Sequence, residues 1–186
     1  MGPILQDEPD LVEGAKSNPE AFGAIYTHYF PRVYNYVRFR VGGPDAADDL
    51  TARIFEIILD KIELYNASRG VFASWLFAIA HNVVTDFYRS SAKQSWVALD
   101  AIGDVACTEP GPEETAVVGE FREELLTALA RLEERERNII ALKFKAGLTN
   151  RHIAELIGLS ESNVGVILYR AIRQLRSILK SGGVSR

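Results

Sequence analysis

The chain has 186 residues, of which 47% are hydrophobic and 25% charged, a composition that suits one or two small globular domains and excludes a largely disordered chain. No apolar run approaches the roughly 18–20 residues that span a bilayer, and the first residues lack the basic start of a signal peptide, so we expect a cytoplasmic protein. The net charge of −4 conceals an asymmetry, because residues 131–186 carry eleven basic and five acidic side chains, whereas residues 1–130 carry ten and twenty.

Helical periodicity dominates the first half of the chain and strand patterns are nearly absent, so we predict an all-α fold. Asn18 and Pro19 predict a helix start, with Asn as the N-cap and Pro at the first helical position. Pro31 falls inside the apolar pattern that follows, which predicts a kink or a break there. Gly42 and Gly43 end this segment.

The next predicted helix, at residues 45–62, begins with a cluster of aspartates. We expect Asp45, Asp48 and Asp49 in its first turn, where carboxylates suit the positive end of the helix dipole. Residues 66–70 then have turn chemistry. A third helix follows, whose apolar face consists of Phe72, Trp75, Leu76, Ile79, Val83 and Phe87.

Periodicity fades from about residue 90, where glycines and prolines interrupt the chain. Between Lys93 and Arg122 there is no basic residue, but there are six acidic ones. We interpret residues 93–114 as a flexible acidic linker that joins two small helical domains, at 1–92 and 115–186.

Cysteine and histidine usage predicts neither a disulfide nor a metal site. Cys107 is the single cysteine, and we interpret it as a free thiol in a reducing compartment. The histidines, His28, His81 and His152, lie far apart in sequence and share no zinc-like spacing with a cysteine. We therefore expect neither a metal nor another cofactor.

The second half of the chain contains the pattern of a helix-turn-helix. A helix that ends at Gly147 is followed by a cap at Thr149, a short helix at 151–157, and a last helix that Ser160 caps and that runs towards Leu179. The turn itself contains a glycine, which adopts a left-handed backbone without a side-chain penalty. The spacing of small and apolar residues lets the last two helices cross closely.

Polar and basic side chains occupy the outward face of this helix-turn-helix, where they are able to contact base edges and phosphates in a major groove. The side chains that we expect to bind duplex DNA are Arg151, Ser160, Ser162, Asn163, Val166, Tyr169, Arg170 and Arg173. The alternative is a plain amphipathic hairpin with a solvated basic face. The net charge of the second half favours DNA binding.

Two stretches of the second half resemble the promoter-binding domain of extracytoplasmic-function (ECF) sigma factors of the sigma-70 family. These are LEERERNIIALKFKAGLTNRHIAELIGLS at 132–160 and YRAIRQLR at 169–176. In the first half, DAADDL at 45–50, followed by Phe55, resembles the family's polymerase-docking segment. FASWLFAIAHN at 72–82 resembles the segment that opens and recognises the −10 element.

The resemblance, over roughly residues 10–95 and 115–180, implies a non-enzymatic initiation factor with three partners: core RNA polymerase, promoter DNA and an anti-sigma protein. The implied contacts to the polymerase clamp are Asp45, Asp48, Asp49, Leu50, Phe55 and Ile58. The implied contacts to the melted −10 strand are Asn66, Ser68, Arg69, Phe72, Trp75 and Asn82. The −35 element would be bound as duplex by the helix-turn-helix. An anti-sigma protein would contact the helix at 45–62 or the last helix.

Each implied role has a structural alternative. The aromatic rings, Trp75 and Phe87 above all, also suit ordinary core packing, and residues 66–69 also suit a solvated turn. Asp48 and Asp49 also suit helix capping. The linker either mimics RNA in the polymerase's RNA path or is a solvated tether.

The sequence departs from the family pattern at five positions. Arg53 stands where the docking segment usually has an acidic residue. Ala78, Gly165, Ile167 and Ile172 stand where basic residues are usual or frequent, which predicts weaker contacts to the DNA backbone. For the three positions on the last helix, the alternative is a selectivity that depends more on Asn163, Val166 and Arg170.

Two other classes of protein are alternatives to a sigma factor. A conventional helix-turn-helix regulator would bind duplex operators by itself, without polymerase. An enzyme is disfavoured, because the sequence offers no nucleophile–base grouping and no Gly-rich phosphate loop. The adjacent Asp48 and Asp49 would diverge by about 100° on a helix and could not flank one substrate.

Overall fold

The computed structural model describes residues 8–91, 124–125 and 127–181. Within these ranges the secondary structure is helical and contains no strand, as predicted. No helix of the described part has the length and apolarity needed to cross a membrane. The predicted linker at 93–114, with Cys107, lies outside the described residues.

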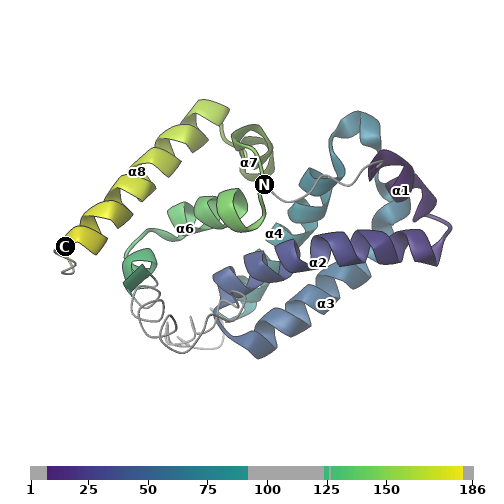
Figure 1. The fold of residues 1–186 in the computed structure, drawn as a ribbon, viewed down its shortest axis with the longest axis horizontal. Helices are drawn as coiled ribbons and strands as arrows, with labels where there is room; N and C mark the ends of the chain where they lie inside the picture. Colours follow the sequence, from purple (N-terminus) through teal and green to yellow (C-terminus); the bar gives the residue numbers. More distant parts are fainter. Residues whose placement is uncertain (1–7, 92–123, 126, 182–186) are drawn as a thin grey trace, which may run out of the picture.

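The N-terminal half is a bundle of four helices: α1 (Glu8–Gly14), α2 (Pro19–Val41), α3 (Pro44–Lys61) and α4 (Phe72–Ser91). Figure 1 shows α3 alongside α2, and both of these helices pack against α4. Two short 3₁₀ turns, Ile62–Leu64 and Ala67–Arg69, connect α3 to α4. The side chains buried between these helices include Ile25, Val33, Val37, Ile54, Ile58, Leu76, Phe77 and Val84.

Helix α2 begins where the sequence predicts and continues through its internal proline. The Asn18 side chain accepts a hydrogen bond from the Glu20 backbone N–H at 2.9 Å, which confirms the N-cap. The predicted break at Pro31 is wrong, because α2 is one uninterrupted helix. Pro31 and Thr27, whose carbonyl loses its helical donor, are both exposed, so water can hydrogen-bond that carbonyl.

Helix α3 begins at Pro44, one residue earlier than expected. Asp45 is therefore the acidic residue of its first turn. The prediction that Asp48 and Asp49 also lie in the first turn is wrong, since both fall in the second turn, where the helix dipole acts weakly on them. The N-cap residue, Gly43, supplies no side-chain hydrogen bond.

The C-terminal half consists of α6 (Glu134–Ile140), a π-helical turn (Ala141–Lys145), α7 (Asn150–Ile157) and α8 (Glu161–Ser181). A capping box of Glu133 and Glu136 starts α6. Gly147 has a φ of 70° and ends the segment as predicted.

The two helical domains pack against each other, and their buried side chains form one continuous core. Figure 1 shows α6 and α7 beside the N-terminal half, whereas α8 points away from it. Helix α2 contacts the π-helical turn, and α4 contacts α7. The sequence predicts two modules joined by a linker and gives no indication of this direct contact.

Candidate nucleic-acid interface

Helices α7 and α8 form the predicted helix-turn-helix, and local hydrogen bonds set its geometry. The Thr149 hydroxyl accepts a hydrogen bond from the His152 backbone N–H at 3.2 Å and caps α7. Gly158, with φ 69° and ψ 40°, turns the chain in the left-handed conformation that favours glycine. The Ser160 hydroxyl accepts a hydrogen bond from the Asn163 backbone N–H at 3.2 Å and caps α8.

All eight side chains predicted to bind duplex DNA are exposed: Arg151, Ser160, Ser162, Asn163, Val166, Tyr169, Arg170 and Arg173. Two of these are apolar or aromatic, since Val166 is 46% exposed and Tyr169 is 66% exposed. The Arg151 guanidinium pairs with the Glu155 carboxylate at 3.1 Å, so its charge is partly compensated. The opposite face of α8 is buried through Val164, Leu168, Ala171 and Leu175.

The structure gives a packing reason for one departure from the family pattern on α8. Ile167 and Ile172 are half-buried rather than on the outward face, and Ile167 packs against the core. A Cβ added at Gly165 would lie 3.8 Å from the Asn150 amide nitrogen, which is an ordinary contact. Space therefore does not require glycine at this position.

The candidate −10 loop, residues 66–72, is held in shape by its own hydrogen bonds. The Asn66 side chain accepts hydrogen bonds from the Ser68 backbone N–H at 2.9 Å and from the Ser68 hydroxyl at 2.7 Å. The Tyr65 hydroxyl donates to the Gly70 carbonyl at 2.9 Å. Arg69 is exposed, so the loop offers one cation to a DNA backbone.

An aromatic cluster supports this loop. Phe72 lies within 5.5 Å of the ring centroids of Tyr29, Tyr65 and Trp75. Phe72 is buried, with 1% of its surface exposed, so its predicted contact with the melted strand is corrected to a core role. Trp75 is half-buried and retains a face towards the surface.

Two hollows flank the loop, and both are also lined by α7. The first, of 310 Å³, lies between the loop, Trp75 and Leu156 of α7. The second, of 580 Å³, lies between the loop, α1 and Arg151 of α7. His152 and Glu155 line both hollows. The candidate −10 loop thus faces the first helix of the helix-turn-helix.

Asn82 does not join the other predicted −10 residues. It is exposed and lines a separate groove of 450 Å³ between α3 and α4, together with Arg53, Asp86 and Phe87. The loop residues 66–72 do not line this groove. The structure therefore brings together only part of the predicted −10 set.

The predicted polymerase contacts divide between the surface and the core. Asp45, Asp48 and Asp49 are exposed on α3, and Leu50 is half-buried at the α3–α4 groove. Phe55 and Ile58 are 4% and 0% exposed, so their predicted contacts are corrected to core packing. The helical periodicity of apolar residues alone could not distinguish core residues from surface contacts, because both faces of α3 carry apolar residues.

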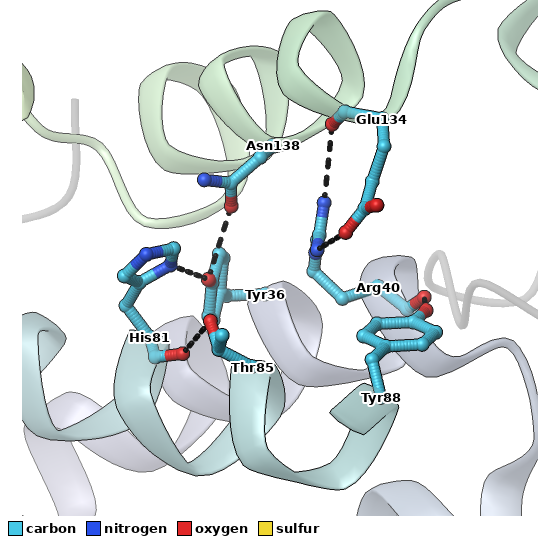
Figure 2. Close-up of polar contacts among 7 residues, drawn as sticks. All are labelled: Tyr36, Arg40, His81, Thr85, Tyr88, Glu134 and Asn138. Carbon is cyan, nitrogen blue, oxygen red and sulfur yellow. Dashed lines mark hydrogen bonds and ion pairs between the residues drawn. The ribbon is translucent and has the colours of Figure 1, made fainter. Parts of the chain in front are cut away.

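Polar contacts between the two domains are a feature that the sequence analysis missed. The Arg32 guanidinium donates to the Ala146 carbonyl from Nε at 3.1 Å and from Nη2 at 2.5 Å. Figure 2 shows two further contacts from α2 to α6. The Tyr36 hydroxyl donates to Asn138 Oδ1 at 3.3 Å. The Arg40 guanidinium pairs with the Glu134 carboxylate at 3.3 Å.

Burial shifts the pKa values of several groups at and beside this domain interface. Burial raises the pKa of the Tyr36 and Tyr88 hydroxyls above the ordinary value of 10.0. Burial, and then the nearby Arg40 charge, lowers the pKa of His81 below 6.5. Among the described residues, no three His, Cys, Asp or Glu side chains gather as a metal site would require.

Comparison with known proteins places both halves of the chain in one family. The model for sigma-70 region 2 matches residues 25–94, and the model for sigma-70 region 4 matches residues 122–175. The ECF RNA polymerase sigma factor BldN of Streptomyces coelicolor is 33% identical over 91% of this chain, which spans 65% of that relative's length. The ECF sigma factor ShbA of Streptomyces griseus is 26% identical over 94% of this chain and 98% of its own length.

Two solved structures have the same fold. CnrH, in complex with the cytosolic domain of CnrY, superimposes with a TM-score of 0.72 at 20% identity, over 96% of this chain and 100% of its own. The Bartonella quintana sigma factor RpoE, in complex with the anti-sigma factor NepR, gives a TM-score of 0.65 at 20% identity, over 90% and 99% of the two chains. With both sigma-70 regions matched in chain order and ECF sigma factors among its relatives, this chain belongs to the ECF group of the sigma-70 family of RNA polymerase sigma factors.

Proposed function

We propose that this chain is a transcription initiation factor, without catalytic activity of its own, that directs bacterial core RNA polymerase to specific promoters in the cytoplasm. The observation that carries the proposal is the exposed polar and basic face of α8 in a chain that matches both sigma-70 regions. Residues 115–186 would bind the −35 element as duplex, and residues 1–92 would bind the polymerase clamp and the −10 strand. Residues 93–114 would connect the two domains.

Within the first domain, we retain the residues of each predicted set that are not buried and that lie together in the structure, which leaves out Phe55, Ile58, Phe72 and Asn82. Asp45, Asp48, Asp49 and Leu50 would contact polymerase. Asn66, Ser68, Arg69 and Trp75 would hold an unstacked base of the −10 strand, since aromatic and polar loop side chains suit a base outside the duplex. An anti-sigma protein would control the factor by covering α3 or α8.

Run-off transcription with purified core polymerase tests the proposal directly. We expect the protein to co-purify with core polymerase and to direct initiation from promoters selected by the reconstituted holoenzyme. Failure of both would contradict the proposal. Tight, site-specific binding of duplex DNA by the protein alone, without any effect on core polymerase, would identify a conventional helix-turn-helix regulator instead.

Arg170→Ala tests the −35 assignment. Arg170 is exposed on the outward face of α8, and the loss of one good contact to a base edge weakens binding by about 1–3 kcal/mol, or about 5- to 150-fold. We expect holoenzyme binding and transcript yield to fall by about tenfold or more in a gel-shift and run-off assay. Lys180→Ala is the matched control, because it removes the same charge about 15 Å further along α8. Equal losses in the two variants would contradict a specific role for Arg170.

A further inference from the structure

Helix α1 lies beside the candidate −10 loop. Glu8, Pro9 and Val12 of α1 line the hollow of 580 Å³ together with residues 67–72 of the loop. Residues 66–71 are themselves exposed throughout, and an exposed loop with few apolar contacts of its own opens easily. The shape of this loop therefore depends on the side chains that pack behind and beside it.

A hydrogen bond joins the beginning of α1 to α2. The Glu8 carboxylate accepts this bond from the Tyr29 hydroxyl. Tyr29 is 1% exposed, and a buried hydroxyl needs a hydrogen-bond partner, which Glu8 supplies. Glu8 is also the first residue of α1, which has seven residues and is too short to be stable as an isolated helix. The bond therefore holds the first turn of α1 in place against α2.

The same tyrosine contacts the aromatic cluster that supports the loop. The Tyr29 ring meets the Phe72 ring edge-on, with the two centroids 5.5 Å apart. Phe72 in turn lies 5.2 Å from the Tyr65 ring and 5.5 Å from the Trp75 ring. Tyr65 precedes the loop and Trp75 follows it. A chain of direct contacts thus leads from Glu8 through Tyr29 and Phe72 to both ends of the loop.

The charge of Glu8 also acts on the loop. Burial, and then the charge of Glu8, raises the pKa of the Tyr65 hydroxyl above 10.0. That hydroxyl donates to the Gly70 carbonyl at 2.9 Å, the hydrogen bond that closes the loop. Glu8 thus lies close enough to favour the protonated form of Tyr65 that makes this bond.

We infer that Glu8 is a positioning residue of the −10 loop: through Tyr29 and the aromatic cluster, its carboxylate fixes the loop in the shape that accepts an unstacked base. A loop that becomes ordered only on binding binds more weakly, because the cost of ordering is subtracted from the binding free energy. The role of the loop as a strand-binding site rests on the proposed function, whereas the effect of Glu8 on the order of the loop does not.

Hydrogen exchange of the free, full-length protein measures the order of the loop without any ligand. The backbone N–H groups of Ser68, Arg69 and Gly70 are hydrogen-bonded within the loop, so their exchange reports on its opening. We expect Glu8→Ala to speed exchange at residues 66–72 by about fivefold or more, the factor that corresponds to one typical hydrogen bond. Glu8→Gln keeps an oxygen that accepts from Tyr29 and should restore most of the protection.

Asp10→Ala is the matched control. It removes a carboxylate from the same helix, but Asp10 is exposed and does not line the hollow beside the loop. Exchange at residues 66–72 that is unchanged in Glu8→Ala, or that rises equally in the control, would overturn the positioning role. Faster exchange confined to residues 8–14 would likewise show that Glu8 secures α1 alone.

A second measurement tests whether this order serves strand binding. The probes are fluorescein-labelled single strands with the −10 sequence of a promoter selected by the reconstituted holoenzyme, either intact or with an abasic site at each position in turn. Anisotropy gives the largest ratio of intact to abasic affinity, and this ratio does not change if part of the protein is unfolded. We expect Glu8→Ala to lower the ratio by about fivefold, and Asp10→Ala to leave it at the wild-type value.

The outcomes separate the inference from the proposed function. A wild-type holoenzyme that binds intact and abasic strands equally would contradict the proposed −10 role of the loop, while hydrogen exchange would still decide whether Glu8 orders it. A wild-type preference that persists unchanged in Glu8→Ala would overturn the part of Glu8 in strand binding and leave the proposed −10 role intact.

Discussion

Gly165 lies where α8 passes Asn150 at the start of α7. This single position affects the stability of α8. A helix-interior glycine costs up to about 1 kcal/mol relative to alanine. The position has ordinary helical geometry, and an added Cβ would be 3.8 Å from the nearest atom, the Asn150 amide nitrogen. Neither backbone conformation nor packing therefore demands glycine here.

We accordingly expect Gly165→Ala to stabilise the protein by up to about 1 kcal/mol, which corresponds to a rise of about 2–4 °C in melting temperature. Gly158→Ala is the matched control with the opposite sign, because the φ of Gly158 is 69° and strains any residue with a Cβ. Differential scanning calorimetry of both variants provides the measurement. A lower melting temperature for Gly165→Ala would show that the contact with Asn150 is tighter than an ordinary one.

At the scale of the element, features that depend on a few neighbouring residues were predictable from the sequence. The caps at Asn18, Thr149 and Ser160 and the turn at Gly158 involve side chains and backbone groups within four residues of one another. The continuity of α2 through Pro31 was not predictable, because the cost of the lost hydrogen bond depends on whether that face of α2 meets water.

Leu168→Asp tests the inward face of α8. Leu168 is 6% exposed, so a carboxylate there would be buried without a partner and should destabilise the C-terminal domain by about 3 kcal/mol or more. Val166→Asp, two residues away at a side chain that is 46% exposed, should change stability by no more than about 0.5 kcal/mol. Urea unfolding followed by circular dichroism compares the two variants, and equal midpoints would contradict the assigned faces.

At the scale of the whole molecule, the sequence predicted the two domains but not their contact. Core residues and exposed residues of α8 follow from periodicity within one helix. The partners of Arg32, Tyr36 and Arg40 lie about a hundred residues further along the chain, and no local pattern specifies them. The same limit applies to Phe55 and Phe72, whose burial depends on neighbouring helices.

The folded protein should lose stability in acid. His81 Nδ1 lies 3.4 Å from the Tyr36 hydroxyl, and the charges of Arg40 and Glu134 act on the ring. Burial, together with the Arg40 charge, lowers the pKa of His81 below 6.5. As the pH falls, the unfolded state therefore takes up a proton before the folded state does. Stability should therefore decrease as the pH falls through about 6.5. The pKa of His28 is also lowered, by burial and by Arg32, and its contribution has the same sign.

Thermal unfolding between pH 7.5 and 5.5 measures this effect. We expect the melting temperature of the wild-type protein to fall with pH, and His81→Gln to reduce that dependence. The melting temperature of the double variant, His28→Gln with His81→Gln, should depend still less on pH. A pH dependence that is identical in all three proteins would contradict the assignment to these histidines.

The bend between the π-helical turn and α7 sets the direction in which α7 and α8 leave the N-terminal domain. Ala146 receives Arg32, Gly147 turns the chain with a φ of 70°, and Thr149 caps α7, all within four residues. A Cβ at Gly147 would lie 3.5 Å from the Arg32 guanidinium, an ordinary contact, so the positive φ rather than a lack of space favours glycine at this corner. Arg32, which binds this corner to the N-terminal domain, thus lies at the point from which α7 and α8 depart. A small change in the orientation of Arg32 would become a larger displacement at the far end of α8.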